Sequence, residues 1–524
     1  MKKLLKKLIP DFLLSWYHWK LAFLGALVYG FPSRKLKVIG VTGTKGKSTV
    51  VVLAGKILQE AGNTSPQPSP NLGEGVNPPQ PSPASSAGQA LKGGSSSPPL
   101  EPVLNSIQEG VRGDFSLKVG WISSLTINDG RKEVMNPYHM TMPGRFFIQK
   151  MLARMKKNGC DYVLLEVTSE GIKQHRHRFI NFSGAVFTNL AAEHIEAHGS
   201  FAKYREAKMK LFEAAAKNPA SFGVYNLDDE NARHFLAPEI KKKYGYALKN
   251  NFQFPTLRVV TRRATISNFQ SIFKISNVQL NANGSEFEID DVNFKTNLLG
   301  EFNVYNCAAA IGVGMACGVG LETSARALEK IKSIPGRLEI IDEGQNFTVV
   351  VDLAHTPDSF EKVFKLFKEL KDSSSPQTRG GLRWGGENNG NISPGPSSTE
   401  EGRSVPKIIS VFGSAGGGRD KWKRPELGKI ASEFSDIVII CNEDSYDEDP
   451  LSIADDILVG CDKNKADIVL DRREAIKRAL GLARAGDIVL ILGKGTEQTM
   501  VIGSKKYPWD DREVMREELI KLCH

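Results

Sequence analysis

A glycine-rich turn near the amino end of the chain carries the residue types that hold nucleotide phosphates. The stretch VIGVTGTKGKSTVVVLAGKIL, from Val38 to Leu58, is an apolar run, a turn and a segment with helical spacing of apolar residues. In a P-loop, backbone N–H groups and a lysine bind phosphate oxygens, while a hydroxyl group binds Mg²⁺. Although Val41 stands where the strict motif has its first glycine, the pattern predicts a nucleotide-binding turn formed by Gly43, Thr44, Gly46, Lys47 and Ser48.

The turn TGTKGKS closely resembles the TGTNGKT/S loop of the Mur ligase family, the ATP-dependent amide-bond-forming enzymes of peptidoglycan assembly. The stretches LLEVTSEGIKQHRHR and AVFTNLAAEHIEAHGSFAKYREAKMKLF resemble the next two signatures of that family. The resemblance implies that ATP and two Mg²⁺ ions bind here, with Ser48, Glu166, His194 and a carbamylated Lys208 as metal ligands. On physical grounds as well, a carboxylate at the end of a strand beside a P-loop is where a magnesium ligand belongs.

Two later stretches extend the resemblance to the rest of the nucleotide. LLGEFNVYNCAAAIG resembles the adenine-side motif, which implies that the amides of Asn303 and Asn306 lie near the base. A helix-capping role for Asn303 is the alternative. PGRLEII and VVVDLAHTPDSFEKV resemble the linker and first strand of the family's C-terminal domain, where Arg337 and Asp352 would contact phosphate and ribose, with His355 nearby. Closure of that domain over the P-loop would exclude water.

The C-terminal half narrows the resemblance to the MurE-type branch of the family. The stretches VFGSAGGGRDKWKRPELGKIASEFSD, GDIVLILGKGTEQ and YPWDDREVMREEL resemble its signatures. That branch adds a third residue, usually meso-diaminopimelate or lysine, to UDP-MurNAc-L-Ala-D-Glu. By motif, Arg419 would bind the carboxylate of the incoming amino acid and Glu497 its distal amine. The residues that would face the muramoyl-peptide are Thr141, Ser169, Gln174 and Arg176.

Three departures from the family pattern concern the substrates. EDSY replaces the DNPR motif associated with diaminopimelate, so Tyr446 stands in place of an arginine. GKGTE replaces GKGHE, and TMP replaces TTP. The sequence before Lys37 also shows no counterpart of the family's UDP-binding domain. These departures leave the added amino acid and the means of holding UDP open, whereas the ATP motifs are retained.

The resemblance implies that ATP activates a carboxylate as an acyl phosphate, which an amine then attacks. Lys47 and the Mg²⁺ ions would neutralise the developing charge. Another amide ligase on the same scaffold, such as a folylpolyglutamate or cyanophycin-type synthetase, is one alternative. A catalytically silent, membrane-associated scaffold is the other, although it would have no use for the retained Lys47, Glu166, His194 and Lys208.

The elements that must position these residues follow an α/β pattern. Strand-like runs such as KVIGV, DYVLLEV and GAVFTNL alternate with helical stretches, which is typical of a parallel sheet. We expect a central P-loop ATPase domain over residues 37–333 and a Rossmann-like C-terminal domain over 334–524. Alternating runs around Asn283–Gly284 predict a small antiparallel subdomain between Thr256 and Leu299. Segments 63–114 and 372–406 are rich in Pro, Ser and Gly, which predicts disordered insertions.

The charge of the chain is concentrated at its amino end. The formal net charge is +10, and eight Lys or Arg against one Asp among residues 1–37 account for +7 of it. A near-balanced remainder gives no reason to expect a nucleic-acid partner. Residues 1–36 form a basic apolar segment, for which peripheral membrane contact through residues 1–31 and a packed N-terminal helix are two open alternatives. Six scattered cysteines favour reduced thiols and a cytoplasmic enzyme, working free or at the inner membrane face. The oligomeric state is left open.

Overall fold

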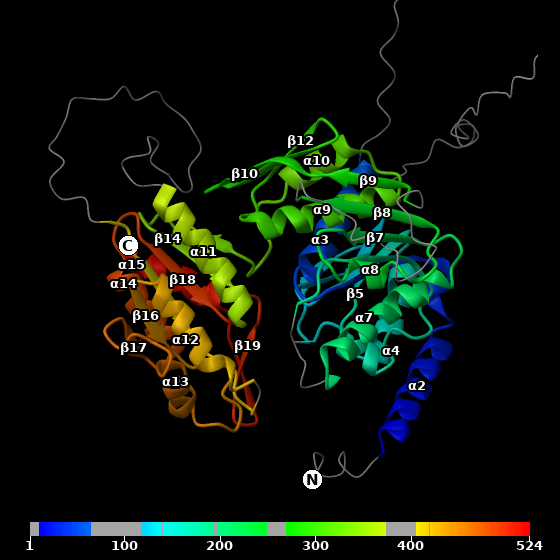
Figure 1. Ribbon diagram of the computed structural model, residues 1–524. Helices are drawn as coiled ribbons and strands as arrows, with labels where there is room; N and C mark the ends of the chain where they lie inside the picture. The colour runs from blue at the N-terminus through cyan, green and yellow to red at the C-terminus, as the bar shows by residue number, and fades with distance from the viewer. Residues whose placement is uncertain are drawn as a thin grey trace, which may run out of the picture.

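Two α/β lobes lie side by side in the computed structural model, with the strands β1–β12 in one lobe and β13–β20 in the other (Figure 1). The structure describes residues 10–63, 117–138, 140–191, 198–248, 269–373, 405–418 and 420–523. The predicted α/β fold with parallel sheets is confirmed. At the borders of the two predicted insertions, Asn63 is the last residue of helix α3, and Asp372 and Ser373 belong to helix α11. Residues 64–114 and 374–404 lie outside the described ranges.

The N-terminal lobe is built on a nine-stranded sheet in the order β4-β3-β2-β5-β1-β6-β7-β8-β9. From β2 to β9 the neighbouring strands are parallel, and β3 and β4 form an antiparallel edge. Most of these strands are apolar along their length, as expected for a parallel sheet that helices cover on both faces. The strands are β1 (Lys37–Thr42), β2 (Val119–Ile122), β3 (Thr126–Asn128), β4 (Glu133–Met135), β5 (Tyr162–Glu166), β6 (Phe182–Phe187), β7 (Phe222–Asn226), β8 (Lys242–Ala247) and β9 (Ser271–Lys274).

Helices cover both faces of this sheet and form two separate apolar cores. One core joins the sheet to α3 (Lys47–Asn63), α9 (Glu301–Ala316) and α10 (Leu321–Glu329). The other joins it to α4 (Arg145–Lys157), α5 (Ser169–Lys173), α7 (Phe201–Ala216) and α8 (Ala232–Phe235). The P-loop leaves the carboxyl end of β1 between these layers, so tertiary packing fixes both its ends.

The antiparallel subdomain is smaller than the sequence suggested. Its three strands are β10 (Ser276–Asn281), β11 (Gly284–Ile289) and β12 (Val292–Thr296), with the predicted hairpin joining β10 to β11. The preceding strand β9 belongs instead to the large parallel sheet, because it pairs in parallel with β8. Residues 249–268, where the subdomain was expected to begin, lie outside the described ranges.

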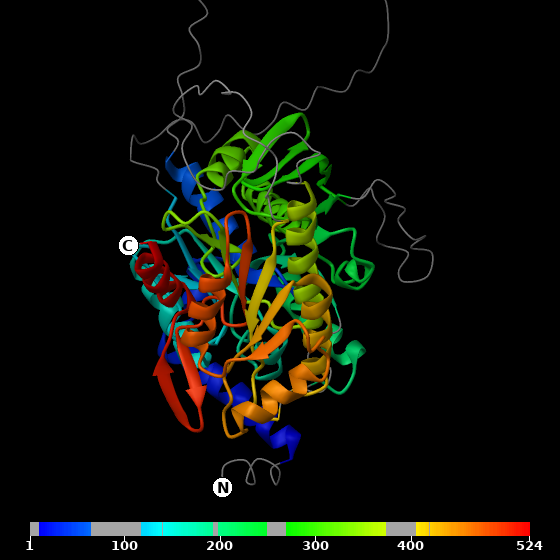
Figure 2. The ribbon, with the colours of Figure 1, turned by 90° about the vertical axis from the view of Figure 1, so that its left-hand side faces the viewer.

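The C-terminal lobe has a six-stranded sheet in the order β13-β14-β18-β15-β16-β17, in which β13 alone runs antiparallel to its neighbour. Figure 2 shows this lobe in front. Its strands are β13 (Glu339–Ile341), β14 (Thr348–Asp352), β15 (Ile408–Phe412), β16 (Ile437–Ile440), β17 (Ala466–Ile468) and β18 (Ile488–Leu492), followed by the hairpin β19 (Thr499–Ile502) and β20 (Lys505–Pro508). Helices α11 (Pro357–Ser373), α12 (Lys423–Phe434) and α13 (Pro450–Leu458) pack on one face, and α14 (Arg472–Leu482) and α15 (Asp511–Cys523) on the other.

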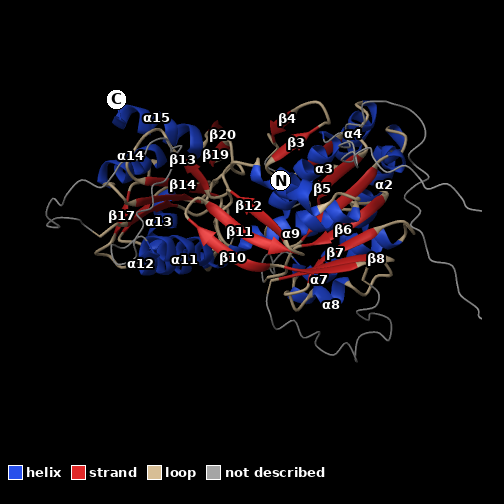
Figure 3. Ribbon diagram, turned by 90° about the horizontal axis from the view of Figure 1, so that it is seen from above, coloured by secondary structure: helices blue, strands red, loops and turns tan. Residues whose placement is uncertain are grey.

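The amino end of the described chain is helix α2 (Asp11–Val28), followed by a short 3-10 turn η1 (Pro32–Lys35). Helix α2 lies against α4 at the edge of the N-terminal lobe that is remote from the C-terminal lobe (Figures 1 and 3). Among the described helices, none has the length and apolar character needed to cross a membrane.

Candidate active site

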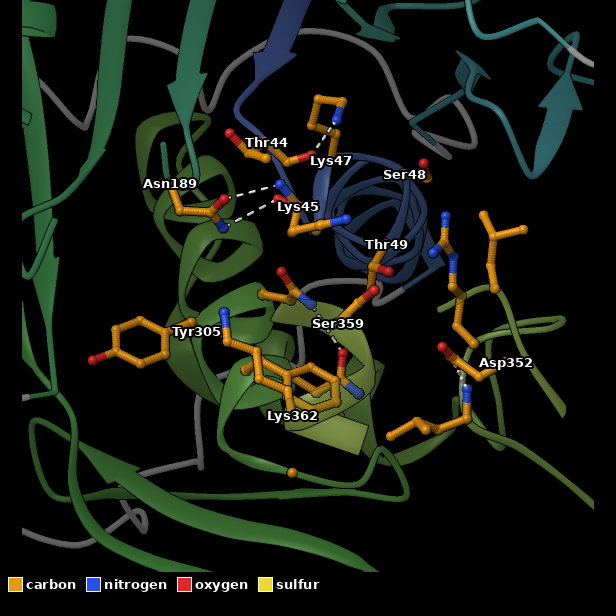
Figure 4. Close-up of a pocket in the computed structure, with 18 of the residues that line it drawn as sticks. Thr44, Lys45, Lys47, Ser48, Thr49, Asn189, Tyr305, Asp352, Ser359 and Lys362 are labelled. Atoms are coloured by element: carbon orange, nitrogen blue, oxygen red, sulfur yellow. Dashed lines mark hydrogen bonds between the residues drawn. The ribbon is translucent and has the colours of Figure 1, made fainter. Parts of the chain in front are cut away.

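A cavity of about 770 Å³ lies between the two lobes. The P-loop, the first turn of α3 and the start of α9 line it from the N-terminal lobe. The segment after β14 and one side of α11 line it from the C-terminal lobe, where Asp352, Ser359 and Lys362 face the P-loop residues (Figure 4). Both lobes therefore contribute to one site at the carboxyl ends of parallel strands, which is where open α/β sheets bind ligands.

The P-loop is held in place by polar residues that follow strand β6. The backbone N–H of Lys45 donates to Asn189 Oδ1 at 2.9 Å, and Asn189 Nδ2 donates back to the Lys45 carbonyl at 3.2 Å (Figure 4). The hydroxyl of Thr188 donates to the same carbonyl at 2.8 Å. Lys47 Nζ donates to the carbonyl of Thr44 at 2.7 Å, so the lysine folds back over the loop. The conformation of the loop is thus fixed by these hydrogen bonds, with the Lys47 ammonium group next to the Thr44 carbonyl.

A carboxylate and a hydroxyl meet at the base of the P-loop. Ser48 Oγ donates to Glu166 Oε2 at 2.7 Å, and the backbone N–H of Ser124 donates to the same oxygen at 2.8 Å. The hydroxyls of Ser48 and Ser124 are 2.7 Å apart. Oxygen donors of this kind are the ligands that Mg²⁺ prefers, so the residues present fit a magnesium ion. Among the described residues, no three His, Cys, Asp or Glu side chains gather as a metal site.

The other two predicted metal ligands are Lys208 and His194, and the structure describes the first of them. Lys208 is buried on α7, and its Nζ donates to the carbonyl of Gly43 at 2.5 Å. The same ammonium lies 4.5 Å from the centre of the Tyr204 ring. Lys208 therefore reaches the P-loop from the far face of the sheet. His194 lies outside the described residues.

The two asparagines expected near adenine line the cavity at the start of α9. Asn303 Nδ2 donates to the carbonyl of Leu299 at 2.9 Å, and Asn306 Nδ2 donates to Asn303 Oδ1 at 2.9 Å. Gly300 is the N-cap of α9, so Asn303 does not cap the helix. Because Asn306 Oδ1 lies against Gly46, this amide supports the P-loop in the structure. Its contact with the base stays a prediction.

The C-terminal wall of the cavity contains a buried carboxylate. The backbone N–H groups of Leu338 and Ala354 donate to the two oxygens of Asp352 at 2.8 and 2.7 Å. Burial raises the pKa of Asp352, while Arg337 and the two N–H groups act in the opposite direction. Arg337 and His355 also line the cavity. The structure thus brings Arg337, Asp352 and His355 together opposite the P-loop, as the resemblance implied, and their individual roles stay predictions.

A hydrogen bond joins the two lobes across the cavity. Lys45 Nζ, from the P-loop, donates to Thr356 Oγ1 at 3.0 Å. Thr356 begins the turn into α11, where its hydroxyl also contacts Ser359 at 2.8 Å. Lys45 therefore connects the phosphate loop directly to the second lobe.

The residues expected to face the muramoyl-peptide fall into two groups. Thr141 lines the cavity. Gln174, Arg176 and Ser169 are not among its lining residues. Arg176 Nη2 donates to Gln174 Oε1 at 2.7 Å, and Arg176 also donates to the carbonyl of Met142, next to Thr141. In this arrangement Arg176 supports the segment that carries Thr141.

The proposed amine side of the site is an ion-pair network in the C-terminal lobe. Lys494 is fully buried, and its Nζ donates to Asp444 Oδ1 at 3.0 Å and to Glu497 Oε2 at 2.8 Å. Glu497 and its neighbour Thr496 line the cavity. The buried carboxylate of Glu443 lies beside this network, and burial raises its pKa. Arg419 lies outside the described residues.

Four residues that build the site were not predicted from the sequence. Asn189 and Thr188 directly follow a buried strand, and polar residues in that position are a signal that points to the site. Ser124 follows β2, a four-residue strand that comes directly after the long insertion and was not recognised. Lys45 was not singled out in the sequence, and its partner, Thr356, is 311 positions away.

A P-loop with an adjacent magnesium-type donor set, faced by a second α/β lobe, defines a nucleotide-dependent enzyme of two lobes. Two family models match this chain: the Mur ligase middle domain over residues 108–314, and the Mur ligase, glutamate ligase domain over residues 397–495. The UDP-N-acetylmuramyl-tripeptide synthetase of Borreliella afzelii is 31% identical over 502 residues, covering 94% of this chain and 79% of that protein. The chain therefore belongs to the Mur ligase family.

A further relative agrees with this assignment, and two solved structures share the fold. The UDP-N-acetylmuramoyl-L-alanyl-D-glutamate–2,6-diaminopimelate ligase of Syntrophomonas wolfei is 29% identical over 508 residues, covering 95% of this chain and 81% of that protein. A MurF structure from Acinetobacter baumannii has a TM-score of 0.54 at 14% identity, covering 95% and 79% of the two chains. Folylpolyglutamate synthase from Mycobacterium tuberculosis has a TM-score of 0.56 at 14% identity, covering 91% and 92%. At such low identity the two structures show the shared fold alone.

Proposed function

We propose that this chain is an ATP-dependent ligase that adds a diamino acid to UDP-MurNAc-L-Ala-D-Glu. The observation that carries the proposal is the meeting of Ser48 and Glu166 beside Lys47, in a cavity closed on its other side by Asp352 and Arg337. A site of this kind brings ATP to a second substrate away from bulk water. The names of the relatives supply the substrate class, since they are tripeptide synthetases and diaminopimelate ligases.

The proposed reaction has two steps. In the first, an oxygen of the acceptor carboxylate attacks the γ-phosphorus of ATP, the bond to the bridging oxygen breaks, and ADP leaves an acyl phosphate behind. In the second, the amine nitrogen attacks the acyl carbon and gives a tetrahedral intermediate. Inorganic phosphate then leaves with the C–O bond electrons, and the nitrogen loses a proton. Oxide is a poor leaving group, so an amine cannot readily displace it from a carboxylate. The acyl phosphate avoids this step because phosphate leaves instead.

The residues of the P-loop and its surroundings have defined tasks in this proposal. Lys47 balances negative charge on the transferring phosphoryl group. Ser48 and Glu166 would hold Mg²⁺, which supplies further charge neutralisation when it is bound. Lys208 would serve as a carbamate ligand of a second ion together with His194. Support for Lys208 comes from its contact with the Gly43 carbonyl at the P-loop, which puts it within reach of the phosphate site.

The C-terminal lobe is proposed to bind the incoming amino acid. Glu497 lies at the cavity and retains an oxygen beyond the one paired with Lys494, so it can accept from an ammonium group. Asp444 adds a second carboxylate to the same network. With Tyr446 in place of an arginine, the site lacks a guanidinium there for a second carboxylate. These features support a diamino acid as the substrate.

The test is ATP-dependent phosphate release with UDP-MurNAc-L-Ala-D-Glu, supplying diaminopimelate, lysine and ornithine separately and reading the product mass. We expect release that requires both the acceptor and one amine. Glu166→Gln removes the charge and keeps the shape, so turnover should fall by about 10²-fold or more. Glu213→Gln, an exposed change on α7, is the matched control and should leave the rate unchanged.

Three outcomes would contradict parts of the proposal. Turnover that is unaffected by both Glu166→Gln and Lys47→Ala would contradict the site. Activity with a folate-type or other acceptor and none with the muramoyl-dipeptide would keep the ligase chemistry and reject the substrate. Absence of turnover with any acceptor or amine would favour a silent scaffold.

A further inference from the structure

Helix α2 has its apolar side facing outward. Nine of the 24 large apolar residues that are exposed in the described chain belong to this one helix of 18 residues. At about 100° per residue they cover roughly half of the helix circumference. Within that half, Lys20 is the single polar residue. The nine residues, here called the α2 outer face, are Phe12, Leu13, Trp16, Tyr17, Trp19, Phe23, Leu24, Leu27 and Val28.

The inner side of α2 carries mainly small and polar residues, together with the half-buried Leu14 and Leu21. Ala22, Gly25 and Ala26 are buried against the lobe. The backbone at Gly25 approaches α4 so closely that an added Cβ would lie 3.5 Å from the backbone of Arg145 and Phe146. Ser15 Oγ lies 2.8 Å from His175 Nε2. Small and polar residues therefore fix α2 to the protein, and most of its large apolar residues are turned away from it, with Trp19 and Phe23 at the border against Phe179.

We propose that the α2 outer face lies in the surface of an anionic lipid membrane. A contiguous exposed apolar face of this size marks a contact with an apolar partner. Two of its members, Trp16 and Tyr17, are 56% and 54% exposed, and Trp and Tyr are the side chains that favour the membrane–water boundary. Because its other side is packed on α4, the helix lies along the membrane surface and does not span it.

The charges around the α2 outer face match an anionic surface. Lys20 is exposed, and its Nζ lies 3.6 Å from the centre of the Trp16 ring, so its long stem can carry the charge to the headgroups. Arg34 and Lys35 of η1 are exposed just beyond the helix. Residues 1–9 add four lysines and no acidic residue to the sequence before it. This positive charge favours an anionic lipid surface as the partner over a second copy of the chain, because a second copy would bring the same basic groups together.

The position of α2 suits such contact without blocking the active site. Figures 1 and 3 show the helix at the outer edge of the N-terminal lobe, on the side remote from the C-terminal lobe. Trp19 and Phe23 pack edge-on against Phe179, with ring centres 5.4 Å apart in each case. The membrane-facing helix therefore rests on the segment that follows Arg176.

The experiment is flotation of the full chain with vesicles of phosphatidylcholine containing 30% phosphatidylglycerol, compared with vesicles of phosphatidylcholine alone. We expect binding to the anionic vesicles that weakens as salt increases. Trp16→Glu combined with Leu27→Glu should lower the bound fraction at least about tenfold. Val459→Glu is the matched control, because Val459 is 80% exposed in the C-terminal lobe, and it should bind like the wild type.

Further measurements separate loss of lipid binding from other causes. All four changed or control positions are exposed, so the melting temperatures of the variants should agree with that of the wild type. Lys20→Glu should weaken binding to anionic vesicles and leave the apolar face intact. Equal flotation of wild type and double variant would overturn the proposal. So would a wild-type dimer that dissociates on Trp16→Glu/Leu27→Glu without any vesicle binding, which would assign the α2 outer face to a second copy. Equal binding to uncharged vesicles would overturn the anionic requirement.

Discussion

Gly46 in the P-loop is the position where one added methyl group should do the most damage to nucleotide binding. Its φ is +80°, a left-handed conformation that glycine adopts freely and that costs other residues roughly 1–2 kcal/mol. A Cβ at this position would also lie 2.1 Å from Asn306 Oδ1. The Asn306 amide would have to move, which would break its 2.9 Å hydrogen bond to Asn303, worth about 0.5–1.5 kcal/mol.

Together these effects give Gly46→Ala a cost of about 1.5–3.5 kcal/mol. If the loop keeps its conformation, the free energy of unfolding falls by this amount. If the loop relaxes instead, its backbone N–H groups no longer point at the phosphates and ATP binds more weakly. Because each 1.4 kcal/mol is tenfold in binding, complete relaxation corresponds to about 10–300-fold weaker binding of ATP. Calorimetric titration with ATP and Mg²⁺, together with thermal unfolding of the free protein, measures both parts.

Gly481→Ala is the matched control for this prediction. Gly481 lies within α14, and an added Cβ there would meet nothing within 4 Å. The control should leave ATP affinity unchanged and stabilise the protein by about 0.5–1 kcal/mol, because alanine favours a helix over glycine. Relative to Asn306→Ala alone, the double variant Gly46→Ala/Asn306→Ala has no collision and bears only the backbone cost. If Gly46→Ala matches wild type in both affinity and melting temperature, the reasoning is refuted.

Two further predictions concern stability. Asp511 and Arg472 form a fully buried ion pair at 2.6 Å, so Asp511→Asn should lower the free energy of unfolding by about 3–5 kcal/mol in urea titrations. The exposed pair Glu361–Lys365 is the comparison, and a loss from Glu361→Gln equal to that from Asp511→Asn would contradict the role of burial. Burial lowers the pKa of His177 to about 3, so between pH 6.5 and 3 the unfolded chain binds a proton that the folded chain does not. The free energy of unfolding should therefore fall by about 2 kcal/mol from pH 7 to pH 5, and His177→Gln should remove that part of the pH dependence. Urea titrations at the two pH values measure it. If wild type and His177→Gln lose the same free energy between pH 7 and pH 5, the prediction is contradicted.

The strands and the phosphate loop were predictable because their signals are local. The run from Val38 to Val41 within β1 is buried on both faces of a parallel sheet, so it must be apolar and is visible without knowledge of its neighbours. The glycines of the loop are required by backbone conformation, which is also a local property. Residues that work at a strand end, such as Glu166, could be identified for the same reason.

Other features depended on residues that are distant in the sequence. The assignment of β9 to the large sheet follows from its pairing with β8, across residues 249–268, so its own sequence did not reveal it. Ser124 became part of the site because β2 lies next to β5 in the sheet. Asn306 was expected near adenine because its motif resembles the adenine-side motif, and only the packing of α9 shows that its oxygen also lies against Gly46.

The sequence by itself determined that this chain has a turn of the P-loop type, that its two large sheets are mainly parallel, and that its motifs are those of a Mur ligase. These are properties of residue type and short spacing. Tertiary structure decided that Lys45 joins the phosphate loop to Thr356 in the second lobe, and that α2 exposes most of its large apolar side chains. An apolar helix reads the same in sequence whichever side it buries, because only the packing of Gly25 and Ala26 on α4 fixes its rotation.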